Sequence, residues 1–260
     1  MRHAKRQQMA QDAAKTQRKK TERSWALING LAAFCVVGVL VFGGYQTITH
    51  PDTPLPPAWN PTQPLRISDP VTPLTNWKLN RAAATETQCL STLQGHAALR
   101  ALAPLKDSDQ CFISDRVDLR GVGQARLAPL ETRCAIALRM AMWEQHSLQP
   151  AAQAFLSTQV TSIAHIGSYN CRAMRTSAGV STRMSTHATA DAVDISGFGL
   201  ADGTQIRLVA DWDGVEAKAA FLRAVRDGAC KWFALTLSPD YNRLHADHFH
   251  LQSRGWGLCR

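Results

Sequence analysis

The sequence lacks the short signatures of several common enzyme classes. It contains no G-x-S-x-G nucleophile elbow, no glycine-rich phosphate-binding loop and no G-x-G-x-x-G dinucleotide fingerprint. It also lacks the H-E-x-x-H zinc motif, any C-x-x-C pair and any visible internal repeat. These absences argue against a serine hydrolase of the elbow type, a nucleotide-binding enzyme, a zinc ribbon and a thioredoxin-like redox protein.

Positive charge is concentrated at the amino terminus and is scarce elsewhere. Residues 1–24 contain eight Lys or Arg residues against Asp12 and Glu22, so this tail supplies +6 of the formal net charge of +9. The rest of the chain is only mildly basic, and its charge does not predict a nucleic-acid-binding domain. We therefore expect no nucleic-acid partner.

An uncharged apolar run, Trp25–Tyr45, follows the basic tail. As a helix this run would cover a hydrocarbon core of ~30 Å, and an aromatic residue stands at each end. We predict a transmembrane signal anchor over residues 25–45, with the tail in the cytoplasm and the rest outside. A cleaved signal peptide is the alternative, but the end of the run offers no clear small-x-small cleavage site.

Cysteine usage agrees with an exported domain. Cys35 lies inside the apolar run, and the other six cysteines all follow it. An even number of cysteines in an oxidising compartment predicts three disulfides, for which Cys89 with Cys111 is the favoured local pair. Six reduced, buried thiols are the alternative.

Residues 46–74 are expected to form a proline-rich linker. Eight of the twelve prolines fall between positions 51 and 73, and proline is excluded from helix and sheet interiors. We predict an extended, semi-rigid spacer there that holds a globular head, residues 75–260, away from a membrane surface. A head of this length can bury one sizeable core.

The head is predicted to be an α+β domain, in which helices pack on one side of an antiparallel sheet. Apolar residues at helical spacing and runs of β-branched residues place the main elements. The expected helices are 82–102, 131–143, 150–156 and 215–227, and the expected strands include 160–166, 192–195 and 248–252.

Four of the nine histidines lie in two short segments of the last third of the chain. The first segment places His187 seven positions before Asp194, and the second, residues 245–250, holds three histidines and an aspartate. Zinc takes imidazole nitrogen and carboxylate oxygen, and a catalytic site keeps three protein ligands and one open position. The predicted ligands are His187, Asp194 and His250, which leaves Asp247 and His248 for proton transfer beside the metal.

For any one of these residues, a plainer interpretation is available. His187 alone could be a surface histidine, and Asp194 alone a buried carboxylate bonded to the backbone. Asp247 could cap a turn, and His248 could merely bond Asp247. Asp191 is expected to be an exposed polar residue of the turn. The order and spacing of the whole set favour the metal site.

The same segments resemble a known group of enzymes. They are similar to the S-x-H-x-x-G-x-A-x-D and H-x-H signatures of the LAS metallopeptidases (lysostaphin-type, D-Ala-D-Ala-type and sonic hedgehog-type), with Ala190 in place of the glycine. The chain from about Cys89 to Arg260 also resembles the extensin-like C-terminal domain of bacterial envelope proteins. Segments that carry this second resemblance are Gly167–Arg172, Asp194–Phe198, Arg226–Cys230 and Gly257–Arg260.

The resemblance implies a fold like that of hedgehog and DD-peptidases and a role for each residue. Asp247 would be the general base, His248 would stabilise the oxyanion or orient water, and His245 could orient the base. Arg172 would bind a peptide carboxylate, with Arg175 and Arg183 as competitors for that role, and Tyr241 could line the cleft. The candidate substrate-binding residues are Arg172, Arg183 and Ser185.

These expectations converge on a zinc metallopeptidase, an endopeptidase or carboxypeptidase, that acts on the peptide part of peptidoglycan. It would be a single-pass protein of the bacterial inner membrane with a periplasmic head, and its oligomeric state is not predicted. A non-catalytic, metal-containing domain that binds the cell wall or acts as a scaffold is the alternative, because hedgehog-like relatives show that the fold does not guarantee turnover.

Overall fold

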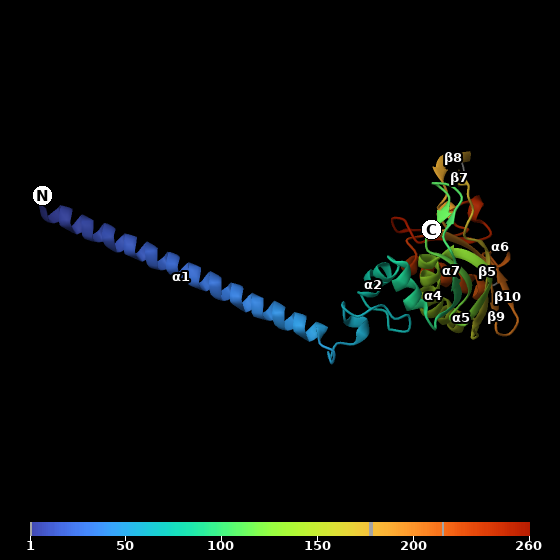
Figure 1. Ribbon diagram of the computed structural model, residues 1–260, viewed down its shortest axis with the longest axis horizontal. Coiled ribbons are helices and arrows are strands. Elements are labelled where there is room, and N and C mark those ends of the chain that lie inside the picture. The colour runs from blue at the N-terminus through green and yellow to red at the C-terminus, as the bar shows by residue number, and fades with distance from the viewer. Residues whose placement is uncertain (1, 177–178, 215) are drawn as a thin grey trace. The chain divides into compact units, whose positions relative to one another are not determined.

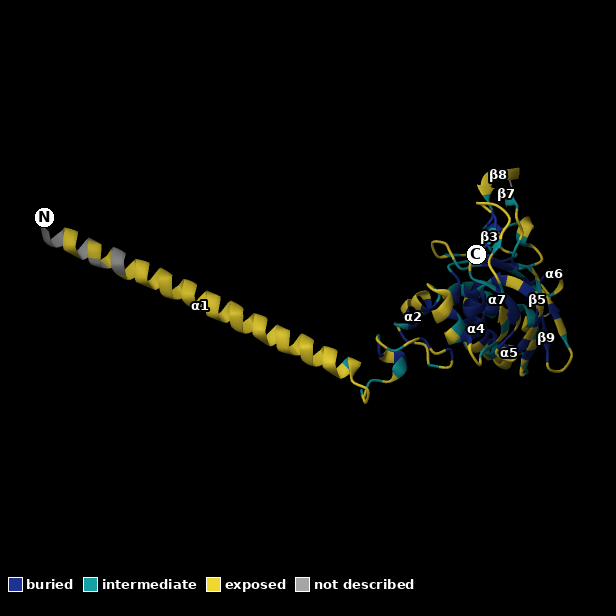
Figure 2. Cartoon of the chain, in the orientation of Figure 1, coloured by how far each residue is buried: buried dark blue, intermediate teal, exposed yellow. Residues whose placement is uncertain are grey.

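A computed structural model describes residues 2–176, 179–214 and 216–260. The chain divides into two units, Met1–Pro56 and Pro57–Arg260 (Figure 1). The first unit is dominated by helix α1 (Arg2–Thr49), whose described side chains are exposed along almost its whole length (Figure 2). Its segment Ala14–Thr49 is long and apolar enough to cross a membrane, a property that a signal sequence shares.

The second unit is built on one large sheet. The order of its described strands is β1-β4-β5-β6-β9-β12-β11-β13, with β10 paired to β9. Neighbours run antiparallel except β5 with β6 and β11 with β13, which are parallel. The strands are β1 (Ala97–Ala101), β4 (Arg116–Val122), β5 (Ala125–Arg133), β6 (Val160–Gly167), β9 (Ala192–Leu200), β10 (Gln205–Arg207), β11 (Leu235–Leu237), β12 (Phe249–Gln252) and β13 (Leu258–Cys259).

Helices pack against this sheet from one side. Helix α4 contacts β4 and β5, α7 contacts β11 and β13, and α7 also contacts both α4 and α5 (Figure 1). The predicted α+β class, with a mainly antiparallel sheet, is therefore confirmed. The helices are α2 (Thr75–Ala82), α3 (Glu86–Leu93), α4 (Cys134–Trp143), α5 (Gln149–Leu156), α6 (Leu208–Asp211) and α7 (Glu216–Trp232), with a π-helical segment η2 (Glu144–Leu148) between α4 and α5.

Smaller elements complete the head. Two short hairpins lie apart from the main sheet, one formed by β2 (Leu105–Lys106) and β3 (Phe112–Ile113), the other by β7 (Ala173–Thr176) and β8 (Gly179–Met184). Three single turns of 3₁₀ helix are η1 (Pro57–Trp59), η3 (Thr186–Thr189) and η4 (Arg243–His245).

The core between helices and sheet is rich in aromatic residues. Trp143 of α4 is fully buried, and its ring meets Phe198 of β9 edge-on at 5.9 Å and Phe233 at 6.3 Å. Its indole N–H donates to the backbone oxygen of Val225 on α7 at 3.0 Å, so this polar group is satisfied inside the core. The core therefore fixes α4 and α7 against the central strands.

Two of the expected helices were wrong in extent. The first, 82–102, is interrupted: α3 ends at Leu93, Gly95 adopts a left-handed conformation with φ +78°, and residues 97–101 form edge strand β1. The second, 131–143, begins only at Cys134, because the preceding residues belong to β5. In both cases pairing with a neighbouring strand outweighs the local helical pattern.

The six cysteines beyond α1 form three disulfides, as predicted, but the favoured pair Cys89–Cys111 was wrong. The bridges are Cys89–Cys134, Cys111–Cys171 and Cys230–Cys259. Cys89 is buried on α3, which packs on α4, and it therefore meets the first residue of α4. Sequence proximity favoured the local pair, whereas packing between the two helices decides the partner.

The proline-rich segment differs from the expected spacer, because residues 57–74 are part of the folded head. Leu65 and Ile67 are buried in the core, and His146 bonds the backbone oxygen of Ile67 at 2.7 Å. The ammonium group of Lys78 on α2 donates to the backbone oxygen of Pro57 at 2.6 Å. This strap, residues 57–74, leaves only residues 50–56 between α1 and the head.

Substitution of Ile67 tests whether the strap is part of the folded unit. Ile67→Ala removes a fully buried side chain, so the free energy of unfolding of the whole protein should fall by about 2–4 kcal/mol. The matched control is Val71→Ala in the same strap, whose side chain is exposed and whose loss should change it by less than about 0.5 kcal/mol. Equal denaturation midpoints for the two variants would contradict a packed strap.

Candidate metal centre

Two imidazoles and a carboxylate converge on the face of the sheet that faces away from the helices. One nitrogen each of His187 and His250 and one oxygen of Asp194 all lie within 4.8 Å of one another. Nε2 of His187 is 3.1 Å from Oδ2 of Asp194 and 3.2 Å from Nδ1 of His250. Nδ1 of His250 is 2.8 Å from Oδ1 of Asp194. The structure thus brings together the three residues predicted as zinc ligands.

Strand pairing places two of the three residues. Asp194 on β9 and His250 on β12 are direct cross-strand partners, so their side chains leave the same face. The flanking residues Val193, Phe249 and Leu251 point the other way into the core, as strand alternation requires. The sheet therefore sets the spacing between carboxylate and imidazole.

A short turn brings His187 to the same place. It lies on η3, whose first residue follows Ser185; the Ser185 hydroxyl accepts the backbone N–H of His187 at 3.3 Å. The turn ends at Ala190, which adopts a left-handed conformation with φ +49°. This is the position where the LAS signature carries glycine, and a left-handed alanine costs roughly 1 kcal/mol relative to glycine. Ser185, expected to bind substrate, thus positions His187 and also lines the adjoining cleft.

Hydrogen bonds fix which nitrogen of each imidazole faces the site. Nδ1 of His187 lies 2.7 Å from the backbone oxygen of Ser168, which can only accept, so Nδ1 carries the proton and Nε2 is free. Nε2 of His250 lies 2.7 Å from the side-chain amide of Gln252. Gln252 therefore holds the Nε2 edge of this ring, and Nδ1 is the nitrogen that faces Asp194.

The electrostatics of the site favour the metal-binding forms of Asp194 and His250. Burial would raise the pKa of the Asp194 carboxyl, but hydrogen bonds and charges from His187 and His250 outweigh it and hold that pKa well below its usual range. Burial also lowers the pKa of His250, although Asp194 opposes this shift. A carboxylate with a neutral imidazole is the protonation state that a divalent cation requires. The donor set therefore fits zinc.

His248 faces the triad, whereas Asp247 lies behind it. Nε2 of His248 is 3.6 Å from Oδ1 of Asp194, and its Nδ1 is 2.7 Å from Oδ1 of Asp247. The Asp247 side chain is 59% exposed and does not line the cleft. β12 begins at Phe249, so His248 precedes the strand on which it was expected. Asp247 is therefore placed to orient His248, and His248 is placed to reach a ligand.

His245 packs beside these histidines. Its ring is 5.3 Å from that of His248 and 5.7 Å from that of His250, and its Nδ1 is 2.8 Å from Oδ1 of Asn242. Burial, followed by the charges of His250 and His248, lowers the pKa of His245 to about 4. His245 is thus an uncharged side chain at the edge of the site, and its contact with Asn242 in the turn before β12 holds it there.

Two members of the triad, Asp194 and His250, line a cleft of about 570 Å³, which His187 does not line. Its lining is cationic on the β7–β8 side, where Arg172, Arg175 and Arg183 contribute, and none of the three forms an ion pair with another described residue. The other lining residues include two exposed aromatic side chains, Tyr241 and Trp256. The predicted site residues that line the cleft are Arg172, Arg183, Ser185, Asp194, His245, His248 and His250, together with Tyr241 and Trp256.

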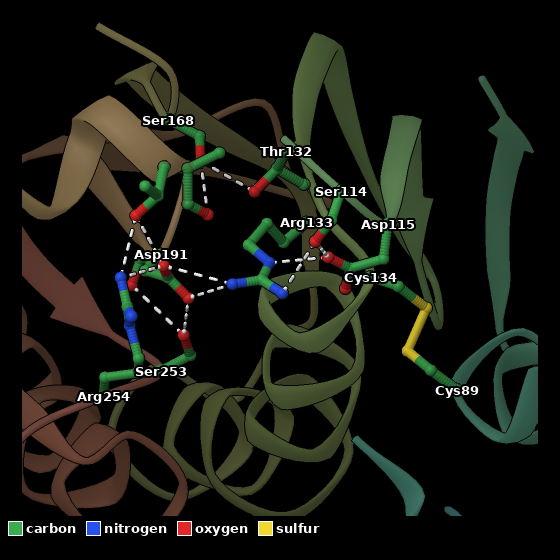
Figure 3. Close-up of polar contacts among 12 residues, drawn as sticks. Cys89, Ser114, Asp115, Thr132, Arg133, Cys134, Ser168, Asp191, Ser253 and Arg254 are labelled. Atoms are coloured by element: carbon green, nitrogen blue, oxygen red, sulfur yellow. Dashed lines mark hydrogen bonds and ion pairs between the residues drawn. A yellow bond between two sulfur atoms is a disulfide. The ribbon is translucent and has the colours of Figure 1, made fainter. Parts of the chain in front are cut away.

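Asp191 is the residue whose importance the sequence did not indicate. Its side chain is 2% exposed rather than on the surface, and its carboxylate accepts from Arg133 at 3.0 and 3.2 Å (Figure 3). It also accepts from Thr189 at 2.6 Å and Ser253 at 3.0 Å, and it pairs with Arg254. The three partners besides Arg133 belong to the His187 turn and to the end of β12. Its position within the S-x-H-x6-D segment was the only available signal.

The backbone beside the turn is supported in the same way. The backbone oxygen of Ser168 accepts the hydrogen bond from His187, and the Ser168 side chain is buried. Its hydroxyl forms hydrogen bonds with the Thr132 hydroxyl at 2.7 Å and with the backbone oxygen of Ala192 at 2.6 Å (Figure 3). Arg133 in turn bonds Asp115 at 2.6 Å. The chain of contacts from β5 to the metal triad is therefore continuous.

Asp191→Asn tests this support. The neutral amide leaves Arg133 partly buried beside a single carboxylate, so the free energy of unfolding should fall by about 3 kcal/mol, as when one member of a buried ion pair is removed. Asp109→Asn, at a 93% exposed residue that pairs with Lys106, should change it by less than about 0.5 kcal/mol. Chemical denaturation measures both, and indistinguishable unfolding of the two variants would refute the role given to Asp191.

Comparison with known proteins agrees with the region that holds this site. The family described as Extensin-like protein C-terminus matches residues 87–260, which is more than half of the chain and includes every residue of the triad. Searches among curated proteins and among solved structures gave no match.

Proposed function

We propose that this chain, which belongs to the extensin-like protein C-terminus family, is a membrane-anchored zinc peptidase of the bacterial periplasm that hydrolyses amide bonds in the peptide part of peptidoglycan. The observation that carries the proposal is the triad of His187, Asp194 and His250, of which Asp194 and His250 line a cleft together with His248. The resemblance of this pattern to the LAS signatures supplies the reaction and the substrate class.

The triad supports a catalytic rather than a purely structural site. Structural zinc sites are closed by four protein ligands, whereas catalytic sites keep three and leave one position open. Two imidazoles and one carboxylate form the group here, and no described cysteine or further acidic residue joins it. Zinc, when bound, supplies a Lewis acid that polarises a carbonyl and lowers the pKa of water.

His248 and Asp247 form the pair that would move the proton. The Asp247 carboxylate accepts the Nδ1 proton of His248, which leaves the Nε2 lone pair directed toward the triad. His248 would take a proton from the attacking water at Nε2 and return it to the leaving amine, while Asp247 stabilises the charged imidazole. The base role expected of Asp247 thus passes to His248, and Asp247 becomes its positioning residue.

The cationic side of the cleft fits an anionic peptide. Arg172, Arg175 and Arg183 present guanidinium groups beside a single lining carboxylate, that of Asp194. A guanidinium binds a carboxylate through two parallel hydrogen bonds, which orients a peptide as well as attracting it. Arg172 belongs to the segment Gly167–Arg172, which precedes the His187 turn and carries part of the family resemblance. We therefore propose that Arg172 binds the carboxylate of the bound peptide.

Location outside the cytoplasm is consistent with two structural features. Helix α1 contains an apolar segment of membrane-spanning length behind a basic tail, and three disulfides lie beyond it. Disulfides persist in oxidising compartments such as the periplasm. Anchoring by α1 would place the catalytic head beside the cell wall.

Zinc content tests the ligand assignment. The oxidised protein should hold one equivalent of zinc by elemental analysis, and His187→Ala or His250→Ala should remove it because only two ligands remain. His96→Ala is the control, since this histidine lies in the turn after α3 and should leave the zinc content unchanged. Full occupancy in either ligand variant would show that the assignment is wrong.

Hydrolysis of isolated muropeptides tests the activity itself. Native protein should release products that mass spectrometry identifies and that a chelator abolishes. His248→Gln should keep its zinc but lose activity by ~10²–10⁴-fold, the usual effect of removing an acid–base group. Asp247→Asn should lose about 10–100-fold, as partners that orient a functional imidazole do.

His96→Gln is the control and should be as active as the native protein. The same assay distinguishes a peptidase from a non-catalytic wall-binding domain. If the native protein cleaves no muropeptide yet binds intact sacculi with one zinc per chain, the non-catalytic wall-binding alternative replaces the peptidase.

A further inference from the structure

The first folded residues after α1 carry three large apolar side chains on the surface. Trp59 is 50% exposed, Val71 is 56% exposed and Trp77 is 48% exposed, although each adjoins buried residues in sequence. Two of the three are tryptophans, and most of the surface of a tryptophan side chain is normally buried in a folded domain. We call these three residues the strap patch.

Hydrogen bonds gather the strap patch at one place. The Thr72 hydroxyl donates to the backbone oxygen of Ala58 at 3.0 Å, which brings Val71 close to Trp59. Lys78 donates to the backbone oxygen of Pro57, which brings Trp77 to the same turn. Each member is thus one or two residues from a hydrogen bond that ends on Pro57 or Ala58, so the chain segments that carry the three exposed side chains meet at these two residues.

Chain length limits how far the strap patch can lie from the end of α1. Residues 50–56 connect Thr49 to Pro57, and a fully extended chain spans at most about 3.5 Å per residue. This link therefore reaches no more than about 28 Å. A spacer through residue 74 would have allowed more than twice that reach, but the strap is folded into the head.

The chemistry of the strap patch matches the headgroup layer of a bilayer. Tryptophan concentrates at membrane interfaces because its ring is apolar and its N–H is polar. The guanidinium of Arg81 lies 5.5 Å from the centre of the Trp77 ring, and Arg81 forms no ion pair with another described residue. An aromatic ring with a free guanidinium above it suits a layer where acyl chains meet anionic phosphates.

We propose that Trp59, Val71 and Trp77 insert into the outer headgroup layer of the membrane that α1 spans, so that the head rests on the bilayer surface. This inference rests on the proposed anchoring by α1 but not on the peptidase activity. The partner is a lipid surface with anionic headgroups. The strap patch is then a second attachment to the membrane. It adds to the anchoring by α1 and restricts the orientation of the head.

Fluorescence quenching by brominated lipids tests the insertion. The full chain with Trp25→Phe, which removes the tryptophan of α1, is reconstituted in phosphatidylglycerol-containing vesicles with bromines near the headgroups. We expect quenching that Trp59→Ala with Trp77→Ala abolishes. Trp256→Ala, at an 85% exposed tryptophan of the metal cleft, should leave that quenching unchanged. Unchanged zinc content confirms that each variant is folded.

Protease protection of the same vesicles separates failure of the inference from failure of the anchoring. A protected α1 with no quenching through Trp59 and Trp77 would overturn the inference and leave the anchoring intact. An unprotected α1 would overturn both. Arg81→Gln should weaken insertion about fivefold at low salt, and so reduce the quenching, because one cation no longer contacts phosphate.

Discussion

The buried carboxylate of Asp191 makes the interactions on which the geometry of the candidate metal centre depends. The residue sits between the turn that carries His187 and the end of the strand that carries His250, and its backbone bonds both: its N–H donates to Thr186 and its oxygen accepts from Ser253. Its side chain holds Arg133 from β5 at the same time. A charge in this position is stable only because guanidinium groups and hydroxyls surround it. The sheet, the turn and the C-terminal loop are therefore joined at one point beside the triad.

The sheet and the turn together hold the three side chains of the triad in fixed positions. β9 and β12 fix Asp194 and His250 as cross-strand partners, so their distance follows from the sheet and not from the loops. The third residue comes from a turn, and turns are mobile unless something restrains them. The bond from His187 to Ser168, and the bonds from Ser168 to Thr132 and Ala192, supply that restraint. Ligand geometry is thus prepared before any metal arrives, which reduces the cost of ordering on binding.

The features that local sequence pattern could predict are those set by local backbone geometry. The triad follows from a seven-residue separation and from the position of His250 on a strand, and the strands 160–166 and 192–195 follow from their β-branched and apolar residues. What escaped prediction depends on contacts far apart in the chain. Cys89 pairs with Cys134 because α3 packs on α4, and residues 97–101 form a strand because β4 accepts them. Asp191 reads as a surface residue until Arg133, 58 positions away, is placed against it. The strap illustrates the same limit, because proline content predicts the absence of helix but not the burial of Ile67.

We expect the triad to provide three protein ligands to zinc and to leave one position open. X-ray absorption at the zinc edge of the purified protein measures this directly. The expected spectrum shows a shell of light atoms alone at about 2.0–2.1 Å, with the multiple-scattering pattern of two imidazoles and with oxygen from a carboxylate and a solvent molecule. A sulfur ligand at about 2.3 Å, or the scattering of a third imidazole such as His248 closing the fourth position, would contradict it.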